Sequence, residues 1–183
     1  MRLLLALILV VFVVSTAPAM EIEGVKVEPQ VLVDSEALQL NGSGIRKKFF
    51  FKIYVGSLYA TRRLTSSTEA LDDTGDKLIR MDFVYPKVEK EKIVEAFREG
   101  FRNNTPDFAN AAEVKAFLSL FTSDFKRGDR VDIFLGGNGN VVAKHNGKIL
   151  GTLVSYPLAT AILAIYLGDH PADENLKKGL LGK

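Results

Sequence analysis

The sequence predicts an α+β fold in which one large, mainly antiparallel sheet is covered on one face by helices. Strand patterns come first, two helix patterns follow, three short strands form a meander, and helices end the chain. This order lacks the regular alternation of strand and helix that a doubly wound parallel sheet requires. Residues 20–183 are enough for one domain with its own core.

Residues 1–19 have the pattern of a cleaved signal peptide. Arg2 is followed by an apolar run over residues 3–14 and by small residues ending in Ala17-Pro18-Ala19, the order that signal peptidase recognises. We expect cleavage after Ala19 and a periplasmic or secreted location for the mature domain. A membrane anchor is the alternative, but a spanning helix needs roughly 20 apolar residues, so we expect no stable membrane anchor after cleavage.

Composition argues against several classes of function. The chain has 24 Lys and Arg against 22 Asp and Glu, whereas nucleic-acid binding normally shows a large, clustered excess of basic residues. It has no Cys and only 2 His, which leaves no disulfide framework and little for a transition metal to bind. We therefore expect no nucleic-acid partner, no metal and no cofactor, and we expect a monomer.

The longest strand signal covers residues 49–59, and shorter strands precede it. Residues 22–40 alternate between apolar and polar and are interrupted at Pro29 and at Asn41-Gly42, which we interpret as turns. Within residues 49–59 one face is wholly apolar and is expected to point inward, either as plain core or as a pocket wall. That face consists of Phe49, Phe51, Ile53 and Val55.

Helices are predicted where apolar residues recur three and four positions apart. Two such stripes cover residues 93–101 and 114–121, and a short helical turn is expected within the polar connection 61–77. Residues 158–167 are apolar nearly all round, between Pro157 and Gly168, which predicts a buried helix lying on the sheet. A last short helix is expected within residues 171–181.

The meander is predicted from three short strands with turn residues between them. The strands are expected at residues 130–135, 141–145 and 148–153, and Asn146-Gly147 is a strong two-residue hairpin signal. His145 lies in that hairpin and is expected to face solvent, while His170 is expected at the end of the buried helix. No nucleophilic triad can be assembled from these residues, and we predict no catalytic residue.

One segment carries a resemblance to a known family. Leu40-Asn41-Gly42-Ser43-Gly44-Ile45-Arg46 leads into Lys48-Phe49, Lys52, Gly56 and Tyr59, and this resembles the chalcone isomerase-like family, with its L-x-G-x-G-x-R turn and following strand. The C-terminal residues 164–169 look like the terminal helix of that family. The resemblance covers nearly the whole mature chain and implies an open-faced β-sandwich.

The resemblance also implies where a ligand binds. Arg46 matches the arginine that orients substrate in plant chalcone isomerases, but Ile53 stands where those enzymes carry a threonine, and Glu89, Ala96 and Ala159 stand at or near their other polar positions. Loss of the threonine hydroxyl removes a donor on which ring closure would rely.

Family members that bind fatty acids keep the arginine together with a tyrosine. The expected ligand is therefore a small apolar or amphipathic acid held by Arg46, because a guanidinium grips a carboxylate through two parallel hydrogen bonds. We predict Arg46, Tyr59 and Ile53 as ligand-binding residues, with Tyr59 preferred to Tyr54 because strand alternation places Tyr54 on the face opposite Ile53. The alternatives are an isomerase for an unknown chalcone-like substrate and an envelope protein without a ligand.

Overall fold

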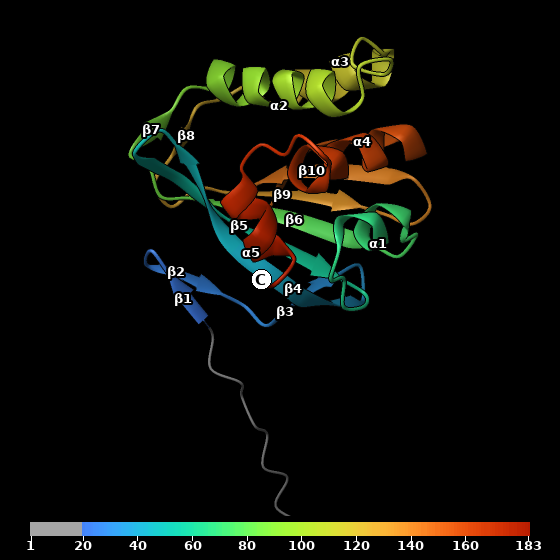
Figure 1. The fold of residues 1–183 in the computed structure, drawn as a ribbon. Coiled ribbons are helices and arrows are strands. Elements are labelled where there is room, and N and C mark those ends of the chain that lie inside the picture. Colours follow the sequence, from blue (N-terminus) through green and yellow to red (C-terminus); the bar gives the residue numbers. More distant parts are fainter. Residues whose placement is uncertain (1–19) are drawn as a thin grey trace, which may run out of the picture.

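The structure is a computed structural model that describes residues 20–183. The predicted signal peptide and its cleavage site after Ala19 lie outside the described residues. Figure 1 shows a broad sheet with helices stacked on one side of it and a short hairpin, β1 (Met20–Ile22) and β2 (Val25–Val27), on the other. No helix in this part of the chain is long and apolar enough to cross a membrane.

Within residues 20–183, seven antiparallel strands form the main sheet, in the order β11-β10-β9-β6-β5-β4-β3. Two short hairpins, β1–β2 and β7–β8, pair separately. The strands are β1 Met20–Ile22, β2 Val25–Val27, β3 Gln30–Val33, β4 Glu36–Lys48, β5 Phe51–Ala60, β6 Lys77–Phe83, β7 Lys87–Val88, β8 Phe125–Lys126, β9 Arg130–Leu135, β10 Asn140–His145 and β11 Lys148–Val154.

In the described part of the chain, five helices lie against one face of this sheet or along its ends. They are α1 Ser67–Asp72, α2 Lys90–Asn104, α3 Ala112–Ser119, α4 Tyr156–Leu167 and α5 Glu174–Leu180. Helix α4 is apolar nearly all round because it lies between the sheet and α2, so both of its sides are buried (Figure 1). The predicted α+β fold with helices over one face is confirmed, and so is the buried helix on the sheet.

The opposite face of the sheet is only partly covered. Val27 of the β1–β2 hairpin packs on Val55 and Val84, and a second small cluster surrounds Tyr59. The main core lies on the helix side, where β5 contributes the even positions Tyr54, Leu58 and Ala60.

The prediction that the odd positions of residues 49–55 form the inward face is therefore wrong. Phe49 and Phe51 are 82% and 54% exposed, and Val55 points away from the helices. Both faces of β5 are buried over much of its length, so alternation of apolar residues could not identify the side that the helices cover.

Asn41-Gly42 is not a turn, because β4 runs through it as one long strand. The register with β5 changes between Leu40 and Gly42, so Asn41 is an extra residue, a β-bulge. Its buried amide donates to the carbonyl oxygens of Leu64 and Leu180 at 2.9 and 2.7 Å and accepts from the Leu64 N–H at 2.7 Å. The amide thus replaces strand partners that the bulge leaves unpaired.

The bulge also moves the even-numbered residues of β4 from one face of the sheet to the other. Before it, Leu38 and Leu40 belong to the outer clusters; after it, Gly42, Gly44 and Arg46 pair with Leu58, Gly56 and Tyr54 on the helix side. A Cβ at Gly42 would lie 2.2 Å from the Gly179 carbonyl oxygen, and one at Gly44 would lie 3.2 Å from the Leu176 Cα. The glycines of the L-x-G-x-G-x-R segment therefore let α5 lie directly on β4.

Candidate functional site

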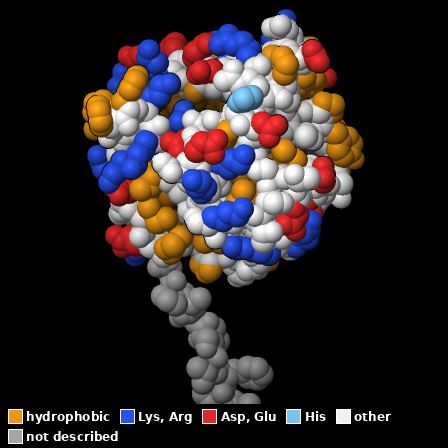
Figure 2. Space-filling view, viewed as in Figure 1, with side chains coloured by type: hydrophobic (Ala, Val, Ile, Leu, Met, Phe, Trp, Pro, Cys, Tyr) orange, Lys and Arg blue, Asp and Glu red, His pale blue; other side chains and the backbone are white. Residues whose placement is uncertain are grey.

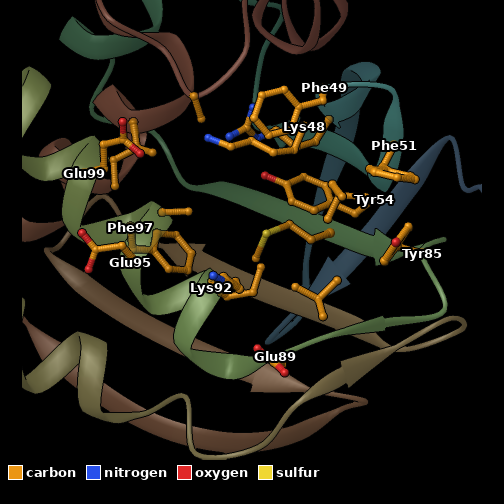
Figure 3. A pocket seen from close by; sticks show the side chains of 18 of the residues that line it. Lys48, Phe49, Phe51, Tyr54, Tyr85, Glu89, Lys92, Glu95, Phe97 and Glu99 are labelled. Atoms are coloured by element: carbon orange, nitrogen blue, oxygen red, sulfur yellow. The ribbon is translucent and has the colours of Figure 1, made fainter.

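A pocket of about 580 Å³ lies between the β4–β5 hairpin and helix α2, a size typical of small-molecule sites. In Figure 3, Lys48, Phe49, Phe51, Tyr54 and Tyr85 line one side, and Glu89, Lys92, Glu95, Phe97 and Glu99 line the other. Helix α4 adds Ile165 and Tyr166. The pocket therefore lies where the sheet meets its covering helices.

The floor and the rim of the pocket differ in character. The floor is buried and largely apolar, formed by Met81, Phe97, Ile165 and the two tyrosines Tyr54 and Tyr166. The rim is exposed and carries charges of both signs: Lys48, Lys87, Glu89, Lys92, Glu95 and Glu99. Such a pocket suits a ligand with an apolar body.

Arg46 lies at the pocket wall, on the side nearest helix α5. Its side chain is 15% exposed, its Nη1 donates to the Lys47 carbonyl oxygen at 3.0 Å, and the same nitrogen lies 3.7 Å from Oδ2 of Asp173. Asp173 is itself the N-cap of α5 and accepts from the N–H groups of Asn175 and Leu176. Helix α5 thus fixes the position of the guanidinium beside the pocket.

Tyr54 is the cross-strand partner of Arg46, and Tyr166 reaches it from α4. Burial raises the pKa of Tyr54, although the Arg46 charge acts in the opposite direction. Burial also raises the pKa of Tyr166 well above its ordinary value. Both phenols therefore remain protonated in neutral solution and can donate hydrogen bonds.

The Tyr166 hydroxyl lies between the Met81 sulfur and the Tyr54 phenol. It donates to the Met81 sulfur at 3.3 Å, and a thioether is a weak acceptor. A carboxylate oxygen would be a much stronger one. Arg46, Tyr54 and Tyr166 together offer one cation and two neutral donors beside an apolar floor.

Ile53 also lines this pocket, because β5 has a bulge at this residue. The register with β4 changes again after Arg46, with Lys47 opposite Lys52, so Ile53 is an extra residue in β5. Its carbonyl accepts from the N–H groups of Val84 and Tyr85. The bulge lets Ile53 and Tyr54, although adjacent in sequence, both contribute to the pocket lining.

Tyr59 is not brought to the pocket, which corrects the sequence-based pairing of Tyr59 with Arg46. It is completely buried on the opposite face of the sheet, where its hydroxyl donates to the Glu28 carbonyl oxygen at 3.1 Å and its ring lies under the Arg80 guanidinium. Strand alternation starting from Ile53 assigns Tyr59 to the wrong face, because Ile53 is itself the bulged residue. The tyrosine that faces Arg46 is Tyr54.

Other positions singled out in the sequence lie in different surroundings. Glu89 and Ala96 line the pocket, whereas Ala159 lies on another part of α4. His145 is not solvent-facing as expected: its side chain is 16% exposed and its Nε2 lies 3.3 Å from Asp129. His170 is exposed, and its backbone is bound by the Asn104 side chain just beyond α4. Within residues 20–183, no three His, Cys, Asp or Glu side chains form a group that could hold a metal.

The family model described as chalcone isomerase-like matches residues 19–182. The chain belongs to the chalcone isomerase-like family. The fold agrees with a crystal structure of an Arabidopsis thaliana fatty-acid binding protein, with a TM-score of 0.63 and 20% sequence identity over 83% of this chain and 95% of that one.

A curated relative gives a second comparison. The chain is 25% identical over 177 residues to the protein named fatty-acid-binding protein 1 from Arabidopsis thaliana. The match covers 80% of this chain and 63% of that relative.

Sequence reasoning missed Tyr166, although a signal for it was present. Helix 158–167 is apolar apart from Thr160, which is exposed, and the Tyr166 hydroxyl. A phenol on a buried helix usually needs a partner in the interior. That requirement points to Tyr166 as a polar group inside the domain, although it does not say which pocket the group enters.

Proposed function

We propose that this protein binds a fatty-acid-like carboxylate in the pocket between β5 and α2, with the carboxylate at Arg46 and the tail against the apolar floor. The observation that carries the proposal is the meeting of one guanidinium and two protonated tyrosine hydroxyls beside the apolar floor of the pocket. The relationship to a protein named for fatty-acid binding supports the same ligand class.

Titration of delipidated protein with a medium-chain fatty acid, followed by calorimetry, tests the anchor. Arg46→Ala should weaken binding by about tenfold to a hundredfold, because a charge-assisted pair to the carboxylate is lost. Lys92→Ala is the matched control, since Lys92 is a basic residue on the exposed rim, and it should change the affinity less than threefold, as expected for a solvated charge.

The methyl ester of the same acid separates the carboxylate from the tail. It should bind the unmodified protein weakly, and Arg46→Ala should not weaken its binding further. Equal affinities of unmodified protein and Arg46→Ala for the free acid would refute the anchor, as would an equal loss in Lys92→Ala.

We propose that the role is binding rather than ring closure of a chalcone. Ile53 lines the pocket at the position that the family resemblance assigns to a threonine, so a hydroxyl donor is missing there. Chalcone absorbance in the presence of the protein should decay at the uncatalysed rate. A rate that rises in proportion to protein concentration and disappears in Arg46→Ala would show an isomerase instead.

We further propose that the domain acts outside the cytoplasm, on the signal-peptide pattern of residues 1–19. Mass spectrometry of the protein recovered from its producing cell should find an N-terminal peptide that begins at Met20, in the periplasmic or secreted fraction. Recovery of peptides containing residues 3–14 from a cytosolic fraction would contradict this.

A further inference from the structure

Three consecutive phenylalanines form the tip of the β4–β5 hairpin and project into solvent. Phe49 is 82% exposed, Phe50 is 97% exposed and Phe51 is 54% exposed. The other large exposed apolar residues in the described part of the chain lie singly or in pairs elsewhere, for example Leu32 at 75%. Scattered exposure needs no explanation, whereas three adjoining aromatic rings on one turn indicate an interaction site.

Basic residues flank these rings on both strands. Lys47 and Lys48 precede the tip and Lys52 follows it. Lys52 pairs with Glu23 at 2.7 Å, but Lys47 and Lys48 have no ion-pair partner among residues 20–183. In Figure 2, apolar and basic side chains lie next to one another on the left side of the molecule, the side on which Figure 1 shows the β4–β5 hairpin.

The hairpin tip and the pocket share residues. Lys48, Phe49 and Phe51 belong to the exposed hairpin and also line the pocket, while Phe50 does not line it. The opposite rim carries charges of both signs, because Lys87 and Lys92 lie among Glu89, Glu95 and Glu99. On the hairpin side, by contrast, the charged lining residues are both basic, Arg46 and Lys48, and they lie beside exposed aromatic rings.

We propose that this hairpin docks on an anionic lipid bilayer, with its phenylalanine rings in the interface and its lysines against acidic headgroups. Aromatic rings flanked by lysines match such a surface, which attracts basic residues and takes up apolar side chains. Because Phe49 and Phe51 also line the pocket, an apolar ligand can pass between bilayer and pocket without crossing water. The passage of ligand rests on the proposed function, whereas the docking does not.

A protein partner fits these features less well than a bilayer. Three phenylalanine side chains can bury roughly 750 Å² at most, which is less than the about 800 Å² that a stable interface buries on each partner. A projecting hairpin tip also offers no groove in which a peptide could lie. A bilayer needs neither a groove nor a large area.

A single tryptophan at the tip tests the docking directly, because the chain has no Trp. Protein starting at Met20 keeps every described strand and helix and excludes the apolar run at residues 3–14, which could itself bind lipid. With Phe50→Trp, vesicles of phosphatidylcholine and phosphatidylglycerol should shift the emission to shorter wavelength, and brominated lipid should quench it. Phosphatidylcholine alone should give a much smaller shift, and Leu32→Trp should give none.

Vesicle co-sedimentation with matched variants separates the two contributions. Phe50→Ser should weaken partitioning about tenfold because one apolar ring is lost, and Leu32→Ser should leave it unchanged. Lys47→Glu should weaken it about fivefold or more, whereas Lys178→Glu, the same charge change at an exposed site on α5, should weaken it less than twofold.

The outcomes distinguish a failure of the proposed membrane docking from a failure of the proposed fatty-acid binding in the pocket. Phe50→Ser should bind fatty acid in solution as the unmodified protein does, because Phe50 does not line the pocket. Absence of an emission shift on anionic vesicles, or equal partitioning of Phe50→Ser and unmodified protein, would overturn the docking. So would light scattering that shows a dimer lost in Phe50→Ser, since a second copy would then be the occupant.

Discussion

Two single-residue insertions decide which side chains of β4 and β5 enter the pocket. The bulge at Asn41 turns Arg46 toward the helices, and the bulge at Ile53 brings that residue to the pocket beside Tyr54. Without the first bulge, strict alternation would leave Arg46 on the outer face, with Leu38 and Leu40. The position of the guanidinium thus depends on an asparagine five residues earlier.

Asn41→Ala should destabilise the domain by about 3 kcal/mol. Three buried hydrogen bonds would be lost, leaving the Leu64 N–H and two carbonyl groups without partners. Urea unfolding followed by circular dichroism measures the change. Gln39→Ala, which loses one exposed side-chain contact with Gln30, should cost less than about 0.5 kcal/mol, and an equally small effect of Asn41→Ala would contradict the role of the bulge.

Fatty-acid affinity should be nearly constant from pH 6 to pH 9. Burial raises the pKa of both Tyr54 and Tyr166, so neither hydroxyl becomes an anion in that range, and an arginine side chain stays charged. Calorimetric titrations at pH 6, 7.5 and 9 measure this. A steep loss of affinity between pH 7.5 and pH 9 would show that a phenolate forms beside the ligand.

Sequence reasoning reached Arg46 and Ile53 but not their neighbours. The L-x-G-x-G-x-R segment marks Arg46 through its glycines, whose purpose is a backbone approach that only glycine permits. Strand alternation favours Tyr59 over Tyr54, but alternation fails at a bulge. Tyr166 comes from a helix more than a hundred residues further along the chain, and no local pattern indicates which strand it will face.

Among the elements, β4 and α5 form a contact that is sensitive to side-chain size. The two glycines of β4 lie under α5 at different distances, so their replacement should have graded effects. Gly42→Ala should cost about 3 kcal/mol, because the new Cβ would lie 2.2 Å from a carbonyl oxygen of the helix.

Gly44→Ala should cost only about 1 kcal/mol, since its nearest helix atoms lie at 3.2 Å and can shift by a few tenths of an ångström. Chemical unfolding of both variants provides the comparison. The reverse order of costs would show that α5 can move away from β4 at Gly42 more easily than the contact distances allow.

Most elements could be predicted from the sequence because their signals are local. The stripes of α2 and α3, the end signals of α4 and the Asn146-Gly147 turn each predicted the observed element, and Asn146 and Gly147 both have positive φ as that turn requires. The continuous strand β4 was missed because Asn-Gly favours a turn when only neighbours in sequence are considered. Its partners, Leu64 and Leu180, are distant in the chain.

For the whole molecule, stability should fall as the pH is lowered below about 4. Burial raises the pKa of Glu28, Asp73 and Asp129, but their hydrogen bonds and, for Glu28 and Asp73, cationic neighbours outweigh it, so each pKa lies below its ordinary value. A carboxyl whose pKa is lowered in the folded protein stabilises the fold at pH values above its pKa in the unfolded chain, which is 3.8 for Asp and 4.5 for Glu. That contribution is lost as the pH falls through the folded pKa. Burial raises the pKa of Asp82, which acts in the opposite direction.

The midpoint of urea unfolding should therefore be similar at pH 7 and pH 5 and lower at pH 3. Asp73→Asn should reduce this dependence and should also cost about 3 kcal/mol at pH 7, because the buried Lys77 ammonium loses its carboxylate. Glu113→Gln, which removes a surface carboxyl from α3, should change neither the pH dependence of the midpoint nor the stability at pH 7 by a measurable amount. Midpoints that stay constant down to pH 3 would contradict the assignment.

The capping of α5 by Asp173 also has a consequence for the order of events during biosynthesis. Arg46 is made early, but the residue that holds its guanidinium beside the pocket is made more than a hundred positions later. A nascent chain on the ribosome therefore carries Arg46 without its Asp173 partner, and this side of the pocket cannot reach its finished geometry until translation has passed residue 173.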